Sequence, residues 1–224
     1  MRMRRDWNRR ARENARHYVV TGQHQWTDEE FYESGRIQIE EEVLNDLPNV
    51  CQGRDPKSMR VLEIGCGAGR VTRALAECFG EVYAVDISRE MVRQAREALA
   101  GFPNAHVIRN NGKDLKAVAP HWWGRWGLGK GLEFDFAFSV IVFQHIPSRE
   151  IIENYVREVQ RMLRPGGLFK FQVQGSALGA DANSWVGESF TEQQAREMAE
   201  RCGFELRHQY GAGDQYYWLW YFKR

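Results

Sequence analysis

The sequence is poor in cysteine and has no long apolar run. Its four cysteines, at positions 51, 66, 78 and 202, form no C-x-x-C pair, so the spacing predicts neither a zinc knuckle nor a redox pair. Unpaired cysteines are typical of a reducing environment, and we expect a cytoplasmic protein. The most apolar stretch, residues 137–143, is too short to span a bilayer, and no apolar stretch follows the N-terminal arginines. Neither a transmembrane segment nor a secretory signal is therefore expected.

A strong net charge is also missing. The formal net charge of the 224 residues is +1, so the chain as a whole has no strong field that would attract nucleic acid, and no nucleic-acid partner is expected. The arginines are unevenly spread, however, because seven of them lie within residues 1–16 beside only two acidic residues. This segment is either an electrostatic arm for an anionic partner or a solvated helix, and the second interpretation is favoured because charge runs usually face water.

What the sequence does contain is an alternation of strand and helix patterns in a chain of ordinary composition, 43% hydrophobic and 27% charged. Buried strands are expected at 60–64, 81–85, 105–109, 134–142 and 168–174. Helices are expected at 71–79, 88–99 and 150–163, the last ending at the breaker Arg164-Pro165-Gly166-Gly167. Such alternation predicts a doubly wound α/β fold with a mostly parallel sheet.

The end of the chain has a different pattern. Thr191 is placed to cap a helix that runs to Cys202, and two strands follow near 205–210 and 215–222. Because only residues 211–214 separate these strands, we expect an antiparallel hairpin at one edge of a seven-stranded sheet. The length suits one large domain, and we expect a single domain over residues 1–224.

The first expected strand ends in a glycine-rich turn. Residues 61–70 read VLEIGCGAGR, which places glycines at 65, 67 and 69 before an expected helix. Glycine lets the backbone adopt positive φ there and approach a ligand closely. A dinucleotide-binding loop needs its third glycine at position 70, where this sequence has arginine. The spacing therefore favours an adenosyl ligand without a pyrophosphate over NAD.

Asp86 closes the second expected strand, 21 residues after Gly65. A carboxylate at that place accepts hydrogen bonds from both ribose hydroxyls of such a ligand. The alternative is an aspartate that only caps the next helix or forms a turn. Together with the glycine turn and the order of the elements, Asp86 favours cofactor binding.

Residues 61–86 resemble the first two motifs of class I S-adenosylmethionine (SAM)-dependent methyltransferases. The segment FDFAFS at 134–139 is similar to the family's fourth-strand motif, and RMLRPGG at 161–167 to the motif before its fifth strand. The resemblance implies a Rossmann-like core over 58–224, an N-terminal helical lid over 1–50, SAM as cofactor and a small-molecule methyl acceptor. A nucleic-acid or protein methyltransferase and a non-catalytic SAM-binding subunit are the alternatives. The sequence names neither the acceptor nor the oligomeric state.

The resemblance also implies where the cofactor lies. Gly65 and Gly67 border its methionine part, Asp86 holds the ribose and Ile87 packs on the adenine. Asn111 stands where the family often has an aspartate that accepts from the adenine amino group. The full set of expected contacts is Tyr18, Arg36, Glu63, Gly65, Cys66, Gly67, Asp86, Ile87, Met91, Asn111, Gly112 and Ser139. No acidic pair at metal-ligand spacing is evident, so no metal is expected.

Two residues carry sharper hypotheses. His145, in FQHIP after the fourth expected strand, is the candidate general base, and the alternative is a histidine that anchors the loop. Arg36 is the candidate partner of the SAM carboxylate, and the alternative is a surface arginine paired with Glu33 or Glu40. The three tryptophans within 122–126 either line a substrate, partner or membrane surface or form a local cluster at the sheet edge.

Overall fold

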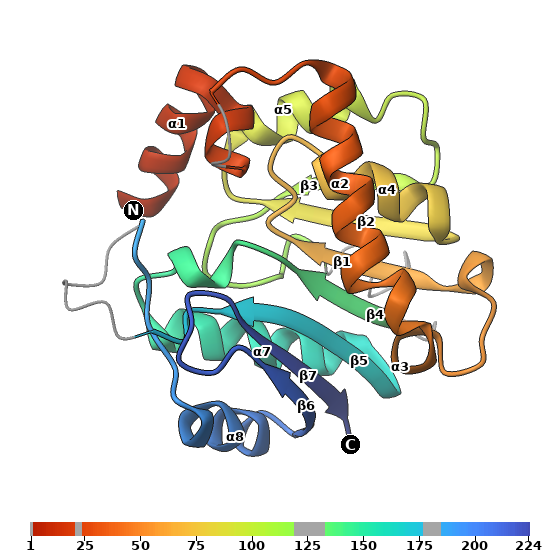
Figure 1. Cartoon of the computed structure of the whole chain (residues 1–224), viewed down its shortest axis with the longest axis vertical. Coiled ribbons are helices and arrows are strands. Elements are labelled where there is room, and N and C mark those ends of the chain that lie inside the picture. Colours follow the sequence, from red (N-terminus) through yellow and green to blue (C-terminus); the bar gives the residue numbers. More distant parts are fainter. Residues whose placement is uncertain (1, 21–23, 119–132, 177–184) are drawn as a thin grey trace. The chain divides into compact units, whose positions relative to one another are not determined.

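The computed structural model describes residues 2–20, 24–118, 133–176 and 185–224 (Figure 1). The tryptophans within 122–126 lie outside the described residues, so both interpretations of them stay open. The chain divides into two compact units, Met1–Gly112 and Lys113–Arg224. Each unit has its own strands and helices, and the single domain over 1–224 stays a prediction.

The first unit begins with helices and continues as alternating strands and helices. Its helices are α1 (Arg2–Val19), α2 (Asp28–Glu42), α3 (Leu47–Cys51), α4 (Arg70–Cys78) and α5 (Arg89–Ala98), with 3-10 turns at Leu44–Asp46 and Pro56–Ser58. Its strands are β1 (Arg60–Ile64), β2 (Glu81–Asp86) and β3 (Ala105–Arg109). β2 pairs in parallel with β1 on one side and with β3 on the other. β1 and β3 have the predicted bounds.

Side-chain caps set where the helices of this unit begin. Ser88 accepts a hydrogen bond from the Met91 N–H at 3.2 Å and starts α5, as predicted. A capping box starts α2. α1 is kinked at Asn14, whose side chain accepts from the His17 N–H at 3.2 Å and so caps the last turn. The two N-terminal helices pack on the unit, α1 against α5 and α2 against α4 (Figure 1).

The second unit contains the antiparallel part of the sheet. Its strands are β4 (Phe134–Ser139), β5 (Leu163–Val173), β6 (Phe204–Tyr210) and β7 (Tyr217–Lys223). Its helices are α7 (Arg149–Met162) and α8 (Glu192–Arg201), with a 3-10 turn, η3, at Phe143–His145. β5 is parallel to β4 and antiparallel to β7, and β7 is antiparallel to β6, so the predicted hairpin is confirmed.

The seven strands have the order β3-β2-β1-β4-β5-β7-β6. The pairs β1–β2, β2–β3 and β4–β5 are parallel, whereas β5–β7 and β6–β7 are antiparallel. The predicted fold class is therefore confirmed: a mostly parallel seven-stranded α/β sheet with an antiparallel edge hairpin. None of the described helices is long and apolar enough to cross a membrane.

Two predicted strand bounds are wrong by three residues or more. The strand predicted for 134–142 ends at Ser139, because Ile141 has a left-handed backbone (φ 56°) that a strand does not contain. β5 begins at Leu163 instead of residue 168, so the Pro-Gly-Gly breaker lies inside the strand. Gly166 has a φ of 73°, and the pairing of β5 with β4 shifts its register there. The breaker forms a bulge because glycine accommodates the extra residues without leaving the sheet.

Candidate functional site

The loop between β1 and α4 has the backbone geometry that its glycines predict. Gly65, Gly67 and Gly69 have positive φ angles of 81°, 53° and 88°. The N–H groups of Gly65 and Cys66 donate to the Val85 carbonyl of β2 at 2.7 and 3.1 Å. The loop is thus tied to the carboxyl end of β2, which is where open α/β folds bind ligands.

Asp86 lies at the end of β2 and holds this loop in place. One carboxylate oxygen accepts from the Gly67 N–H at 3.0 Å, and the other accepts from the Ser88 N–H at 2.7 Å. Burial raises the pKa of Asp86 to about 6, although these hydrogen bonds favour the ionised form. Asp86 therefore does have the turn role that the sequence left as an alternative. Each carboxylate oxygen accepts more than one hydrogen bond, so this role is compatible with ribose binding.

Two opposite charges are buried at the two ends of the glycine loop. Glu63 in β1 is 3% exposed, and Arg70 at the start of α4 is 4% exposed. Burial raises the pKa of Glu63 to about 7 and lowers the pKa of Arg70 to about 10, while each charge favours ionisation of the other. The buried Thr72 hydroxyl interacts with Glu63 and favours its ionised form. Arg70 Nε finds no hydrogen-bond acceptor among the described residues, so the site holds a buried carboxylate and an unsatisfied donor.

Arg70 is kept inside the unit by α2. Its guanidinium donates to the Ser34 carbonyl at 2.9 Å. α2 approaches α4 closely here, because a Cβ atom on Gly35 would lie 2.2 Å from the Arg70 carbonyl oxygen. The sequence does not predict Arg70 as a site residue, since an arginine that begins a helix usually faces solvent. The signal that pointed to it is its place directly after the third glycine.

α1 lies across the glycine loop and the start of α5. Asn8 accepts from the Ser88 hydroxyl at 3.2 Å and from the Glu90 N–H at 3.1 Å. At the other end of the helix, Val19 lies close to the glycine loop: a Cβ atom added to Gly67 would be 2.8 Å from Val19 Cγ2. This placement is compatible with a helix that covers a ligand on the loop.

The remaining expected contacts of this unit differ in exposure. Ile87 lies next to the loop after β3, because a Cβ atom on Gly112 would be 3.1 Å from Ile87 Cγ2, whereas Asn111 is exposed. Cys66 and Met91 are buried in apolar clusters, and burial raises the pKa of the Cys66 thiol. Ile87, the residue after Asp86, therefore lies close to Gly112 in space, whereas Met91 packs in the core.

Tyr18 and Arg36 have partners within the N-terminal helices. The Tyr18 hydroxyl donates to Glu13 at 3.1 Å. Arg36 Nε lies 3.5 Å from Glu33 Oε2, and the Arg36 side chain is 61% exposed. Glu33 is one of the two glutamates that the sequence offered as alternative partners of Arg36. The contact of Arg36 with the SAM carboxylate stays a prediction.

In the second unit, Ser139 and His145 lie on either side of a strained turn. Ser139 ends β4 and is buried, and Ile141, with its left-handed backbone, donates its N–H to the Gln172 side chain at 2.9 Å. His145 in η3 is 7% exposed, and its Nδ1 lies 2.7 Å from the Trp185 carbonyl oxygen. A carbonyl only accepts, so in the neutral ring Nδ1 carries the proton and Nε2 is the basic nitrogen.

Comparisons with known proteins match the central part of this chain to a known family. Residues 61–167 match the sequence profile of a family described as methyltransferase domain. The chain is 31% identical over 155 residues to a trans-aconitate 2-methyltransferase of Rhodopseudomonas palustris, which covers 66% of this chain and 50% of that protein. It is 26% identical over 136 residues to a ubiquinone biosynthesis O-methyltransferase of Xanthomonas oryzae, covering 61% and 52%. The chain thus spans about half the length of these relatives.

Solved structures extend the likeness to the fold. A magnesium protoporphyrin IX methyltransferase from Synechocystis, with bound SAH, matches with a TM-score of 0.67 at 19% identity, over 99% of this chain and 98% of that one. The N-methyltransferase NodS from Bradyrhizobium japonicum, in complex with S-adenosyl-L-homocysteine, matches with a TM-score of 0.66 at 14% identity, over 100% and 99%. At these identities the likeness shows the fold alone. The matched profile and the motifs of residues 61–86 identify residues 61–167 as a class I SAM-dependent methyltransferase domain, and these solved structures share its fold.

Proposed function

We propose that this protein uses SAM to methylate a small-molecule nucleophile. The observation that carries the proposal is the pair of opposite charges buried at the ends of the glycine loop, Glu63 and Arg70, of which Arg70 Nε lacks an acceptor among the described residues. Buried charges and unsatisfied donors are costly, so this pair favours a ligand that carries both a cation and an anion. The amino-acid end of SAM is a zwitterion, and its ammonium and carboxylate groups match Glu63 and Arg70 in sign.

Other groups of the first unit fit the rest of the cofactor. Asp86 has the acceptor capacity for the ribose hydroxyls, and Ile87 beside Gly112 offers an apolar contact for the adenine. The buried Glu63 also favours this ligand over a dinucleotide, because a carboxylate at the loop would repel a pyrophosphate. These residues would therefore hold an adenosyl sulfonium ligand.

The chemistry divides between the cofactor and the chain. SAM, when bound, supplies a methyl group on a sulfonium that is already activated for in-line displacement. The residues of the chain bind the cofactor, orient the acceptor and exclude water. α1 contacts the glycine loop through Val19 and is therefore placed to exclude water. Alignment alone contributes on the order of several kcal/mol to such a reaction, so methyl transfer needs no acid beside the methyl group.

The relatives support a small molecule as the acceptor. By their names, they act on trans-aconitate and in ubiquinone biosynthesis. A nucleic-acid or protein acceptor would instead call for a broad basic or aromatic surface around the site. A cytoplasmic location is part of the same proposal, because the four cysteines form no disulfide, as is typical of a reducing compartment.

S-adenosylhomocysteine, the demethylated form of the cofactor, is expected to raise the melting temperature, and NAD is not. A ligand at a hundred times its dissociation constant adds about 2.7 kcal/mol of stability, on the order of 5–10 °C for a chain of this size. Arg70→Gln is expected to lose most of the shift and Arg36→Gln to keep it, since only Arg70 is buried at the loop. A larger shift with NAD would refute the proposed cofactor. Loss of the shift in Arg36→Gln alone would assign the carboxylate to Arg36.

His145→Ala is expected to lower turnover by roughly a hundredfold or more, with little change in SAM affinity, if the acceptor must lose a proton. Nδ1 is held by the Trp185 carbonyl, which orients Nε2 as the base. The acceptor is first found by methyl transfer from radiolabelled SAM to a panel of small acids, phenols and amines, and kcat is then measured against pH. His208→Ala, at an exposed position in β6, is the control. An unchanged pH profile in His145→Ala would reduce His145 to a loop anchor.

A further inference from the structure

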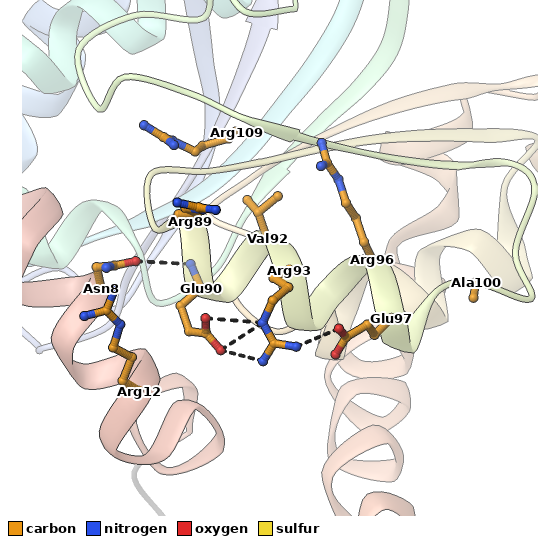
Figure 2. Close-up of a pocket in the computed structure, with 10 residues that line it drawn as sticks. All are labelled: Asn8, Arg12, Arg89, Glu90, Val92, Arg93, Arg96, Glu97, Ala100 and Arg109. Atoms are coloured by element: carbon orange, nitrogen blue, oxygen red, sulfur yellow. Dashed lines mark hydrogen bonds and ion pairs between the residues drawn. The ribbon is translucent and has the colours of Figure 1, made fainter.

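An open, cationic cavity lies on the first unit where α1, the start of α5 and the end of β3 meet. Its volume is about 230 Å³, and the residues that line it are Arg4, Arg5, Asn8, Arg12, Ile87, Arg89 and Arg109. None of them is acidic. Figure 2 shows Arg12, Arg89 and Arg109 reaching this region from three different elements, with Asn8 bonded to the start of α5. The five arginines of the cavity are named the arginine cluster below.

The arginine cluster is exposed and almost without counter-charge. All five side chains belong to exposed residues. Arg4, Arg5, Arg89 and Arg109 form no hydrogen bond or ion pair with any described residue, and Arg12 has only a longer-range attraction to Glu90. Like charges repel over about 8–10 Å at physiological ionic strength. The charges on α1 therefore oppose its packing beside Arg89 and Arg109 unless an anion lies between them.

The other arginines of the adjoining groove along α5 provide a contrast. Arg93 pairs with Glu90 and with Glu97, each at 2.6 Å (Figure 2). Arg96 donates to the Val107 carbonyl at 2.8 Å. An extended polyanion in this groove would meet the two glutamates, which are part of its lining. The unbalanced positive charge is thus confined to the arginine cluster, and this confinement favours a compact anion.

We propose that the arginine cluster binds the phosphate group of a small molecule, at a site outside the proposed cofactor contacts except for Ile87. The planar guanidinium fork pairs with two phosphate oxygens at once, and arginines from three elements can surround one dianion. A lipid phosphate fits less well, because the apolar side of α1 is already used: Ala11 and Ala15 are buried in a cluster with Phe31, Ala68 and Met91. The bound phosphate bridges α1 to α5 and β3 and offsets the repulsion between them.

Isothermal titration calorimetry with sodium pyrophosphate, at an ionic strength held constant with NaCl, tests this site without SAM. We expect the wild-type protein to bind pyrophosphate and the double variant Arg89→Gln/Arg109→Gln to bind it roughly tenfold more weakly or worse. The free double variant is expected to melt at or above the wild-type temperature, because two repelling charges are gone. Lost binding in a variant of undiminished stability then reports on the site and not on folding.

The double variant Arg161→Gln/Arg207→Gln is the matched control, because it removes the same charge from arginines that pair with Glu158 and Glu205. Its pyrophosphate affinity is expected to equal that of the wild type. Equal losses in both double variants would overturn the proposal, as would wild-type binding no tighter than that of sulfate. Phosphatidylglycerol vesicles and a DNA duplex are the further arms, and binding of either without pyrophosphate binding would overturn the assignment to a small molecule.

Discussion

Asp86→Ala is expected to weaken S-adenosylhomocysteine binding by at least roughly a hundredfold while the protein still folds. Two charge-assisted hydrogen bonds to the ribose would be lost, each worth about 1.5–3 kcal/mol. The Gly67 N–H, which bonds to this carboxylate at 3.0 Å, would lose its acceptor as well. The loop that borders the cofactor would then be less well ordered. Calorimetric titration with S-adenosylhomocysteine measures the loss, and circular dichroism establishes that the variant is folded.

Asp86→Asn separates the two roles of this residue. Asparagine keeps one acceptor oxygen for the loop but removes the charge that strengthens the ribose hydrogen bonds. We therefore expect Asp86→Asn to be more stable than Asp86→Ala by about 1 kcal/mol and to bind the cofactor more weakly than the wild type. If both variants bound S-adenosylhomocysteine with wild-type affinity, Asp86 would be a turn residue only, and the ribose would need another partner.

The stability that Glu63 contributes to the free protein is expected to decline as the pH rises from about 4.5 to about 7. Burial raises the pKa of Glu63 from 4.5 to about 7, so the folded state binds more protons than the unfolded state over this interval. The free energy of unfolding then falls with rising pH, by about 3 kcal/mol for a shift of this size. The measurement is urea unfolding at a series of pH values for the wild type and for Glu63→Gln, whose difference isolates this one group.

Glu77→Gln is the control for this series, because Glu77 is exposed on α4 and lies 3.7 Å from Arg73. It is expected to reproduce the wild-type pH dependence. The cofactor provides a second readout, since an ammonium group beside Glu63 favours the ionised carboxylate. S-adenosylhomocysteine affinity is thus expected to rise more steeply between about pH 6 and pH 7.5 in the wild type than in Glu63→Gln, in which Asp86, with its pKa of about 6, still titrates. Parallel pH curves for the wild type and Glu63→Gln would contradict the assignment.

The candidate site was predictable where its signals are local. The glycine turn follows from spacing, because only glycine adopts the positive φ of positions 65, 67 and 69 without strain. Asp86 follows from its place at the end of a buried strand. The burial of Arg70 could not be predicted from the residues around it, because it depends on the packing of α2 against α4. The contact is made at Gly35, more than thirty residues before Arg70 in the sequence. A helix-packing partner of that kind leaves no mark in the sequence next to Arg70.

The same division holds for the fold. The sequence by itself determined the bounds of β1 and β3, the Ser88 cap of α5 and the terminal hairpin, because each depends on neighbouring residues: an apolar run, a hydroxyl beside free N–H groups, or a short connection between strands. Tertiary contacts instead keep the Pro-Gly-Gly breaker in β5 and bring Arg89 and Arg109 to one cavity with the arginines of α1. Those outcomes depend on which strand pairs with β5 and on where α1 packs, and free energies of pairing and packing arise between segments that local sequence does not connect.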